Sequence, residues 1–551
     1  MGPGSRAWDS SFRRRWLSDD DARRCRRILA VVATYWVLDR TTRAIARLDQ
    51  ADAVGAVLVT RALAGHPLVV AGAVVVAVVG AVGLRADGRR RLRGPWTALE
   101  HGNVLRWLAT PPLTLVAWYG TSYRYNYVLE RWHAVDRAAV LVLVVAAWLR
   151  PAFVPLCVLQ ARVIDAQFEL PTGARASQNI ANLVTVTLLV LVAVHVVAAV
   201  TDDADSSAVI VVLATAIAAQ FWVSGQAKLG LRWWSGADPG NFALSSYTAG
   251  WGGKGDGRWA RSLASAFDTG RVPMIAGTVL LEVFSFVAVL RRRLLRIWLV
   301  GWAGFHAVVF ATCGFVLLEW FVVEVGLFVV LAVRRLRPWA ARCHTPACGV
   351  LAAAIVVGGG ATLYRPPRLA WYDSPVAYGY EIEAVGLSGR TYHVPVLALA
   401  PLEQDVGFLF VHFRATPELA AGYGAVGWKP LLDQLAAVRT FDELAALERA
   451  AAPVSPAVRT ASENLVLAWL QSAGAHDTPW FMPSPPPRYW TSRPDPSFDG
   501  DERLRSAAVV LVTSIAMGDA QQWSRVTVLQ AEVDGRGRAA VTWRVGDGGG
   551  S

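Results

Sequence analysis

Lysine is scarce in this chain, and one lysine stands close to the end of a long apolar run. Of the 54 lysines and arginines, only Lys228, Lys254 and Lys429 are lysine. Lys228 follows the apolar residues 208–223 after four residues. A low-dielectric environment favours the neutral form of an amine, so a lysine there can release and accept a proton, whereas arginine keeps its charge. Lys228 is therefore the first candidate for proton chemistry; the alternative is a lysine that extends its ammonium to the lipid headgroups.

Other polar side chains also lie within apolar runs, where each costs free energy unless it meets a partner or a cavity. His306 is the clearest, because it interrupts the apolar run 297–318 and an imidazole can accept or relay a proton. The alternative is a histidine that hydrogen-bonds a neighbouring helix. Glu319 and Glu324 are five residues apart and do not share one helix face well. The remaining candidates are His195, Gln220 and Glu282, with Asp165, Glu169, Asn179 and Asn182 near a boundary.

The composition and the apolar runs indicate an integral membrane protein. Hydrophobic residues make up 54% of the chain and charged residues 17%, and runs without charge fill its first two thirds. The expected fold is an all-α polytopic domain of about eight or nine transmembrane helices, followed by an exported α+β domain. Residues 28–38 form either a short span or an interfacial helix, and 104–119 form a broken or half-inserted segment. Clearer spans are predicted at 68–84, 180–200, 208–223, 273–290 and 349–361, with a pair within 137–164 broken at Arg150-Pro151 and a hairpin at 297–333.

Arginine clusters beside the apolar runs predict the orientation in the cell membrane. They lie at 13–15, 23–27, 89–93, 291–293 and 334–337. Because cytoplasmic flanks carry the excess of positive charge, residues 1–27 are expected to form a basic cytoplasmic tail and 28–363 the transmembrane domain, with the remainder extracellular. The same pattern accounts for the net charge of +12. The predicted partner is therefore the lipid bilayer, and no nucleic acid is expected.

The exported part is expected to contain both strands and helices. Residues 380–399 alternate around Leu387-Ser388-Gly389 as in a β-hairpin, and 431–451 and 457–473 have the periodicity of amphipathic helices. These elements make up the predicted α+β domain 364–475. A proline-rich linker is expected at 476–500, and 501–551 is expected to be a β-containing segment with two strand-like runs around 534–537.

The spacing of cysteine and histidine predicts no metal site. The five cysteines lack the spacing of zinc ligands, and Cys343 and Cys348 would form a local disulfide only if they faced outward. His393, His412 and His476 are scattered, and we expect ordinary surface residues. The glycine-rich run 250–255 lacks the spacing of a phosphate-binding loop. Residues 229–272 are rich in tryptophan and are expected to form a structured loop at the membrane interface.

Two short motifs resemble a known family. The segment Ser224-Gly225-Gln226-Ala227-Lys228-Leu229, followed by Trp234 and Gly236, resembles the stretch AG-x-KL…W-x-x-G in the membrane domain of vitamin K-dependent γ-glutamyl carboxylases and their bacterial relatives, the HTTM family. Phe305-His306, about one span after Glu282, resembles the FH span of the same family. The resemblance covers residues 27–335 in outline, and its specific part is about a dozen residues around Lys228 with Phe305-His306.

The resemblance implies an enzyme that acts with a reduced quinone, either vitamin K hydroquinone or reduced menaquinone. In that family the lysine deprotonates the hydroquinone, which captures dioxygen and becomes a base that removes a γ-proton from peptidyl glutamate, and carbon dioxide then adds. The implied catalytic residues are Lys228 and His306. The implied lining of the substrate or cofactor cavity is Gln178, Asn179, Asn182, Gln220, Trp234 and Glu282.

The chain departs from the family at one position. Family carboxylases have a histidine near the start of an earlier span, whereas residues 177–182 offer amides, which orient a carbonyl but do not titrate. A proton-abstracting reaction linked to a quinone, with a peptide or protein as substrate, is therefore expected more directly than carboxylation. The alternative function is a non-catalytic membrane component of a peptide export, toxin maturation or immunity system. A transporter is less favoured, because no pair of similarly interrupted apolar segments suggests inverted repeats.

Overall fold

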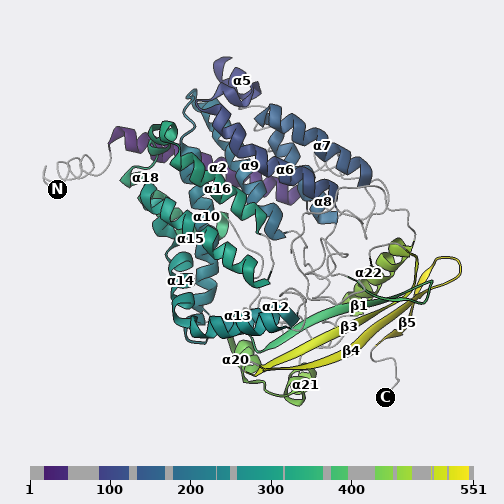
Figure 1. The fold of residues 1–551 in the computed structure, drawn as a ribbon. Helices are drawn as coiled ribbons and strands as arrows, with labels where there is room; N and C mark the ends of the chain where they lie inside the picture. Colours follow the sequence, from purple (N-terminus) through teal and green to yellow (C-terminus); the bar gives the residue numbers. More distant parts are fainter. Residues whose placement is uncertain are drawn as a thin grey trace, which may run out of the picture.

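The chain folds into a large group of helices followed by a smaller antiparallel sheet (Figure 1). The structure is a computed structural model, and it describes residues 18–46, 86–122, 133–167, 178–230, 232–236, 238–248, 257–313, 317–363, 374–394, 429–450, 456–474, 498, 502–517 and 520–544. The predicted span at 68–84 and the proline-rich linker, apart from Phe498, lie outside these residues. A mostly helical chain that ends in a sheet confirms the coarse prediction of fold class.

The first half of the helical part is built around two apolar helices. Helices α9 (Gln178–Thr201) and α10 (Ala208–Gly230) carry apolar residues on every face, and most of the residues described along them are buried. Helices with no polar face need protein or lipid on all sides. The surrounding helices are α2 (Asp19–Ala46), α5 (Ala86–Arg93), α6 (Gly102–Ser122), α7 (His133–Leu149) and α8 (Val154–Gln167), with short 3₁₀ turns η2 (Trp96–Ala98) and η3 (Pro151–Phe153). The predicted break at Arg150-Pro151 separates α7 from α8, and residues 104–119 lie within one continuous helix.

The predicted single span at 273–290 is wrong. Helix α14 (Arg271–Val283) ends at Val283, and a 3₁₀ turn, η4 (Ser285–Leu290), completes the segment. The indole of Trp302 donates to the carbonyl of Leu281 (3.2 Å), and Ser285 Oγ donates to the carbonyl of Ala218 (2.9 Å). These bonds fix the break against two neighbouring helices. The predicted hairpin at 297–333 is confirmed as α15 (Arg292–Cys313) and α16 (Leu318–Ala332).

The region 229–272, predicted as a structured loop, is mainly helical in its described part. It contains α11 (Trp233–Gly236), α12 (Pro239–Thr248) and α13 (Arg258–Thr269), with 249–256 outside the described residues. Beyond α16, the chain forms η5 (Arg334–Leu336), α17 (Arg337–Ala341) and α18 (Pro346–Leu363). Among the described cysteines, Cys343 and Cys348 are both free, so they form no local disulfide.

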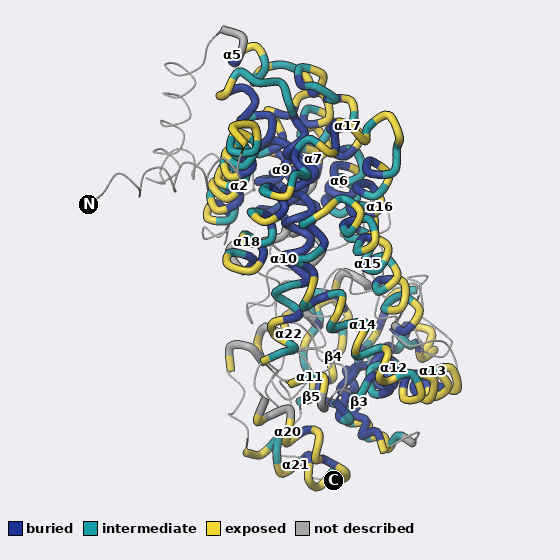
Figure 2. Tube along the Cα trace, turned by 90° about the vertical axis from the view of Figure 1, so that its left-hand side faces the viewer, coloured by how far each residue is buried: buried dark blue, intermediate teal, exposed yellow. Residues whose placement is uncertain are grey.

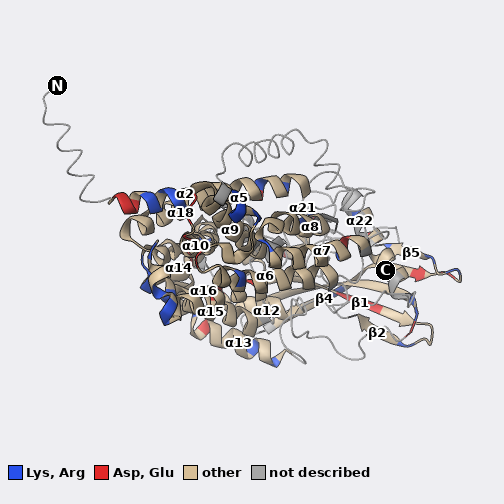
Figure 3. Ribbon diagram, turned by 90° about the horizontal axis from the view of Figure 1, so that it is seen from above, with Lys and Arg blue, Asp and Glu red and all other residues tan. Residues whose placement is uncertain are grey.

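Within the described residues, three helices are long and apolar enough to cross a bilayer. They are Leu183–Thr201 of α9, Ala208–Gly230 of α10 and Arg292–Thr312 of α15, and the pair 334–341 and 346–360, bent by 75°, makes a fourth if it counts as one span. This number is below the eight or nine expected. Helix α16, for example, has 15 residues, which rise about 22 Å against a hydrocarbon core of about 30 Å. Figure 3 shows that Lys and Arg gather on α2, α5 and α13, while most of the helical ribbon is uncharged.

The C-terminal sheet has five antiparallel strands in the order β2-β1-β3-β4-β5. The strands are β1 (Val376–Gly386), β2 (Thr391–Val394), β3 (Leu504–Met517), β4 (Ala520–Val533) and β5 (Ala539–Arg544). The predicted hairpin is confirmed, with Gly389 at φ +83° in its turn. The predicted turn at 534–537 is confirmed as well, but the run before it is two strands, so 501–551 holds three strands. Since β1 pairs with β3, the predicted domain 364–475 and the segment 501–551 contribute to one sheet.

Three helices accompany the sheet: α20 (Lys429–Ala437), α21 (Phe441–Ala450) and α22 (Pro456–Gly474). The predicted helix 431–451 is two helices, because Thr440 begins a new one. The Thr440 hydroxyl accepts the amide of Glu443 (3.3 Å), and the Glu443 carboxylate accepts the amide of Thr440 (3.0 Å). This reciprocal arrangement is a capping box, which marks a helix start.

The sheet meets the helical part through α12, which lies beside β3 and β4 in Figure 2. Ser245 Oγ donates to the carbonyl of Ser374 (3.4 Å), and the hydroxyls of Thr248 and Ser514 lie 2.6 Å apart. Gln521 Nε2 donates to the carbonyl of Leu244 (3.3 Å). Because α12 follows α10 closely in the chain, these contacts place the sheet near the end of α10 that carries Lys228.

A candidate proton-transfer site between helices α10, α14, α15 and α16

Lys228 forms an ion pair with Glu282. Its ammonium contacts both oxygens of the Glu282 carboxylate, and the lysine side chain is 17% exposed against 4% for the glutamate. Helix α10 continues seven residues past the apolar run, so Lys228 lies in its last turn rather than in a break. A buried carboxylate needs a positive partner. Lys228 is that partner for Glu282.

A glycine brings the two helices close enough for this pair. Gly225 precedes Lys228 by three residues and so lies on the same side of α10. A Cβ atom on Gly225 would lie 2.9 Å from the backbone nitrogen of Val283 and 3.0 Å from the carbonyl carbon of Glu282. The absence of a side chain at Gly225 thus permits contact between the backbones of α10 and α14.

Aromatic rings surround the next turn of α10. Phe221 stacks on Trp302, with ring centroids 4.6 Å apart and planes 3° apart, and it also lies 5.7 Å from the ring of His306. Trp320 approaches Phe221 (5.5 Å) and His306 (5.3 Å) edge-on. Phe305 completes the group at 6.3 Å from Phe221. We call Phe221, Trp302, Phe305, His306 and Trp320 the aromatic cluster.

His306 joins the aromatic cluster to two carboxylates. Its Nδ1 lies 3.2 Å from Oε2 of Glu324, and both side chains are buried. The Glu282 carboxylate is also close enough to His306 to interact with it electrostatically. The Lys228–Glu282 pair and the His306–Glu324 pair therefore lie within electrostatic range of each other, on four helices.

Unlike the charged side chains described above, Gln220 has no partner among the described residues. Its side chain is 1% exposed, and neither its amide nitrogen nor its amide oxygen has a hydrogen-bond partner among the described residues. It directly precedes Phe221 of the aromatic cluster. An unpaired buried amide costs about 1–3 kcal/mol. Gln220 thus offers a free donor and a free acceptor beside the cluster.

The site can hold and move protons. Three glutamates, Glu282, Glu319 and Glu324, are buried among these helices, and Lys228 is paired with one of them, Glu282. Carboxylates in an apolar interior must be neutralised by a cation or by a proton. Glu319 accepts a hydrogen bond from the Tyr119 hydroxyl (2.7 Å). Since His306 can neutralise Glu324 when it is protonated, the site contains groups that exchange protons.

The structure brings together some of the predicted residues. Lys228 contacts Glu282, His306 belongs to the aromatic cluster, and Gln220 directly precedes Phe221 of that cluster on α10. Trp234 is not among these residues: it is 47% exposed, and the indole near Lys228 is that of Trp233, whose ring centre lies 5.6 Å from Nζ. The side chains of Gln178, Asn179 and Asn182, in the first turns of α9, lie outside the described part of the structure. His195 bonds the carbonyl of Arg91 (2.7 Å) and lies in a different group of helices.

One buried ion pair, between Arg162 and Asp39, was not predicted from the sequence. Arg162 of α8 donates to Asp39 of α2 (2.6 Å), and it also donates to Thr42 and Thr185. Arg43 contacts the same carboxylate at 2.9 Å. The guanidinium of Arg162 is thus paired with partners on two neighbouring helices, as expected of a group that joins α2, α8 and α9. The change from an apolar run to Asp39-Arg40 was its only sign in the sequence.

Comparisons with known proteins add no family assignment. No family model, no curated protein and no solved structure matches this chain. The function is therefore inferred from the residues of this chain alone.

Proposed function

We propose that this protein is a membrane enzyme that removes a proton from a reduced quinone, in the manner of the vitamin K-dependent γ-carboxylase-like family that its motifs resemble. The observation that carries the proposal is the Lys228–Glu282 ion pair, within electrostatic range of the His306–Glu324 pair in the aromatic cluster. A lysine that only extended to the headgroups would not need a buried carboxylate on another helix.

The residues fit a quinone ring. The buried, unpaired amide of Gln220 can donate to or accept from an oxygen atom of the ring, and the aromatic cluster supplies apolar surroundings. The hydroquinone, reduced menaquinone or vitamin K hydroquinone, would supply an acidic hydroxyl and, once deprotonated, reactivity with dioxygen. The residues of the chain would position the ring and accept the proton.

The ion pair modifies the expected role of Lys228. Because the amine contacts both oxygens of the carboxylate, the base is the pair rather than an isolated lysine. When the proton of the pair lies on Glu282, the neutral amine of Lys228 accepts the proton of a substrate hydroxyl and leaves a positive charge beside the new oxyanion. His306 and Glu324 provide a route by which the proton leaves.

The arginine contacts support the proposed orientation. Arg27, Arg91 and Arg342, from three distant segments, all contact the acidic turn 202–205 just before α10, with Arg91 3.0 Å from Asp202. Lys228 lies at the other end of α10, about 30 Å away at 1.5 Å per residue. We place the arginine end in the cytoplasm and the sheet outside, where a peptide or protein substrate would approach. If the domain has eight or nine transmembrane helices, the others are shorter than the three or four described above.

Oxygen uptake tests the proposal. The full chain, purified without added metal and reconstituted in nanodiscs, is incubated with menaquinone-4 hydroquinone, and dioxygen consumption is measured against empty nanodiscs. We expect consumption above the uncatalysed rate, lost in Glu282→Gln, with or without a glutamate-containing peptide. A wild-type rate equal to that of empty nanodiscs would contradict the enzyme and would favour the non-catalytic component of an export, maturation or immunity system.

A further inference from the structure

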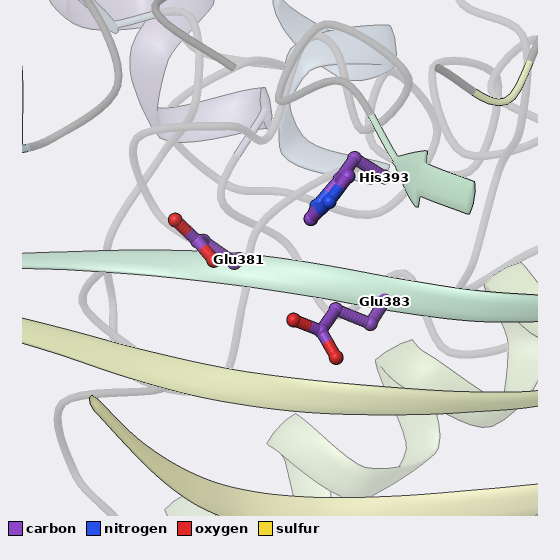
Figure 4. A group of neighbouring side chains, drawn as sticks. All are labelled: Glu381, Glu383 and His393. Atoms are coloured by element: carbon purple, nitrogen blue, oxygen red, sulfur yellow. The ribbon is translucent and has the colours of Figure 1, made fainter. Parts of the chain in front are cut away.

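Three potential metal ligands meet on the sheet, away from the site described above. Glu381 and Glu383 lie two residues apart on β1, so they project from the same face. His393 lies on β2 directly opposite Glu383 in the register of the hairpin. Figure 4 shows the three side chains gathered along β1, with His393 reaching over from β2.

The separations suit one small cation. A carboxylate oxygen from each glutamate and a ring nitrogen of His393 all lie within 4.8 Å of one another. The ligands of a tetrahedral zinc ion, with bonds of about 2.0–2.2 Å, lie about 3.3 Å apart. The side chains therefore need to close by about 1.5 Å at most, which rotation of a glutamate side chain allows. The strands that carry them are held by the sheet.

His393 has a nitrogen available for a ligand. Its Nδ1 is buried and has no hydrogen-bond partner among the described residues, and the side chain is half-buried. A neutral imidazole nitrogen is the commonest metal ligand in proteins. The expectation that His393 is an ordinary surface residue is therefore wrong in one respect, because its ring lies against two carboxylates.

An arginine neutralises the carboxylates in this structure. Arg525 of β4 contacts Glu381 and lies 2.9 Å from Glu383. Its side chain is 49% exposed, so it can move into solvent without burying a charge. A cation would replace Arg525 between the two carboxylates, and the two would compete for the same oxygens.

We propose that Glu381, Glu383 and His393 bind a divalent transition-metal ion, with zinc the best fit, and that Arg525 occupies the position in its absence. One nitrogen and two carboxylate oxygens are a ligand set that zinc accepts, with water in the fourth position. Calcium and magnesium fit less well, because both prefer oxygen ligands alone and a larger number of them. The site is independent of the proposed quinone chemistry.

Zinc titration of the purified full chain tests the site. The chain carries no polyhistidine tag, is stripped with a chelator and is titrated with zinc chloride by calorimetry. We expect wild-type binding of one ion, weakened about tenfold or more by His393→Ala and by Glu381→Gln, because each removes a ligand. Arg525→Gln should bind more tightly than wild type, since the competitor is gone.

Glu532→Gln is the matched control, because Glu532 is an exposed glutamate on β4 of the same sheet. Its affinity for zinc should equal that of wild type. Cobalt(II) in place of zinc should give an intense visible spectrum that is lost in His393→Ala. Equal zinc affinity in wild type and His393→Ala, or weaker binding in Arg525→Gln, would overturn the proposal.

Discussion

At the scale of single residues, the buried polar groups of the helical part differ in how well they are satisfied. Arg162 donates to an acid and two hydroxyls, and Lys228 meets both oxygens of Glu282. Gln220 has no partner among the described residues, although it is as deeply buried. A satisfied group needs no ligand to explain it. Gln220 is therefore the residue at which a missing ligand is most plainly indicated.

Gln220→Met should separate binding from stability. Methionine has nearly the same length and no amide, so the variant should be more stable by about 1–3 kcal/mol, the cost of an unpaired buried amide. It should also bind menaquinone about tenfold more weakly, measured by quenching of tryptophan fluorescence. Thermal unfolding in detergent gives the stability. A lower melting temperature than wild type would mean that the amide has a structural partner and would remove it from the proposed site.

Asp268 should make the protein less stable as pH rises. Although Asp268 is exposed, desolvation by the residues around it and the neighbouring carboxylate of Asp238 raise its pKa above the ordinary value of 3.8. The folded state then keeps its proton at a pH where the unfolded chain has lost it, so stability falls as pH rises from 3.8 through the raised pKa and stays lower above it. Asp268→Asn removes this cost. The melting temperature of Asp268→Asn should exceed that of wild type at pH 7.5, and the difference should shrink toward pH 4.5; a difference independent of pH would show that the cause is not titration.

At the scale of elements, contact between α10 and α14 decides whether Lys228 reaches Glu282. Gly225→Ala places a methyl group 2.9 Å from the backbone of Val283, so the helices must separate, at a cost of about 1–3 kcal/mol. Gly304→Ala on α15 is the matched control, because nothing lies within 4 Å of its added Cβ. The control should gain stability, since alanine is the better helix former by about 0.5–1 kcal/mol. Equal melting temperatures in the two variants would show that the close approach does not matter.

The sequence predicted those elements whose signals are local. The turn at Gly389 and the break at Arg150-Pro151 follow from residues that cannot continue a strand or a helix, and both are present. The break after Val283 could not be predicted, because the indole of Trp302 and the carbonyl of Ala218 stabilise it from other helices. The capping box at Thr440 was visible in the sequence as Thr-Phe-Asp-Glu but was not used.

The sequence singles out candidate residues for the site but does not show how they pair. Polar residues in apolar runs pointed to Lys228, Gln220, Glu282 and His306. The contact of Lys228 with Glu282 joins residues 54 positions apart, and periodicity carries no information about which helices meet. The group of Glu381, Glu383 and His393 was missed for a related reason. It depends on the exact register of a hairpin, and an error of one residue in that register would place His393 on the other face of the sheet.

At the scale of the whole molecule, the sheet lies toward one end of α10. The arginines that contact the turn 202–205, which are Arg27, Arg91 and Arg342, lie toward the other end. The proposed orientation follows from this arrangement, and reporter fusions test it. Alkaline phosphatase, which is active only outside the cytoplasm, should be active when fused after Ser551. A fluorescent protein that matures only in the cytoplasm should be dark at the same position. The reverse result would invert the orientation and place the sheet with the arginines.

The central claim is that Lys228 exchanges a proton. Arginine keeps the charge of lysine and can pair with Glu282, but it does not release its proton near neutrality. The most direct measurement compares Lys228→Arg and Lys228→Ala with wild type in dioxygen uptake with menaquinone-4 hydroquinone, at matched expression and melting temperature. We predict that Lys228→Arg folds as wild type does and loses at least about 100-fold in rate, the usual contribution of a positioned base, as Lys228→Ala does. A rate for Lys228→Arg equal to that of wild type would contradict the claim and leave Lys228 a structural cation.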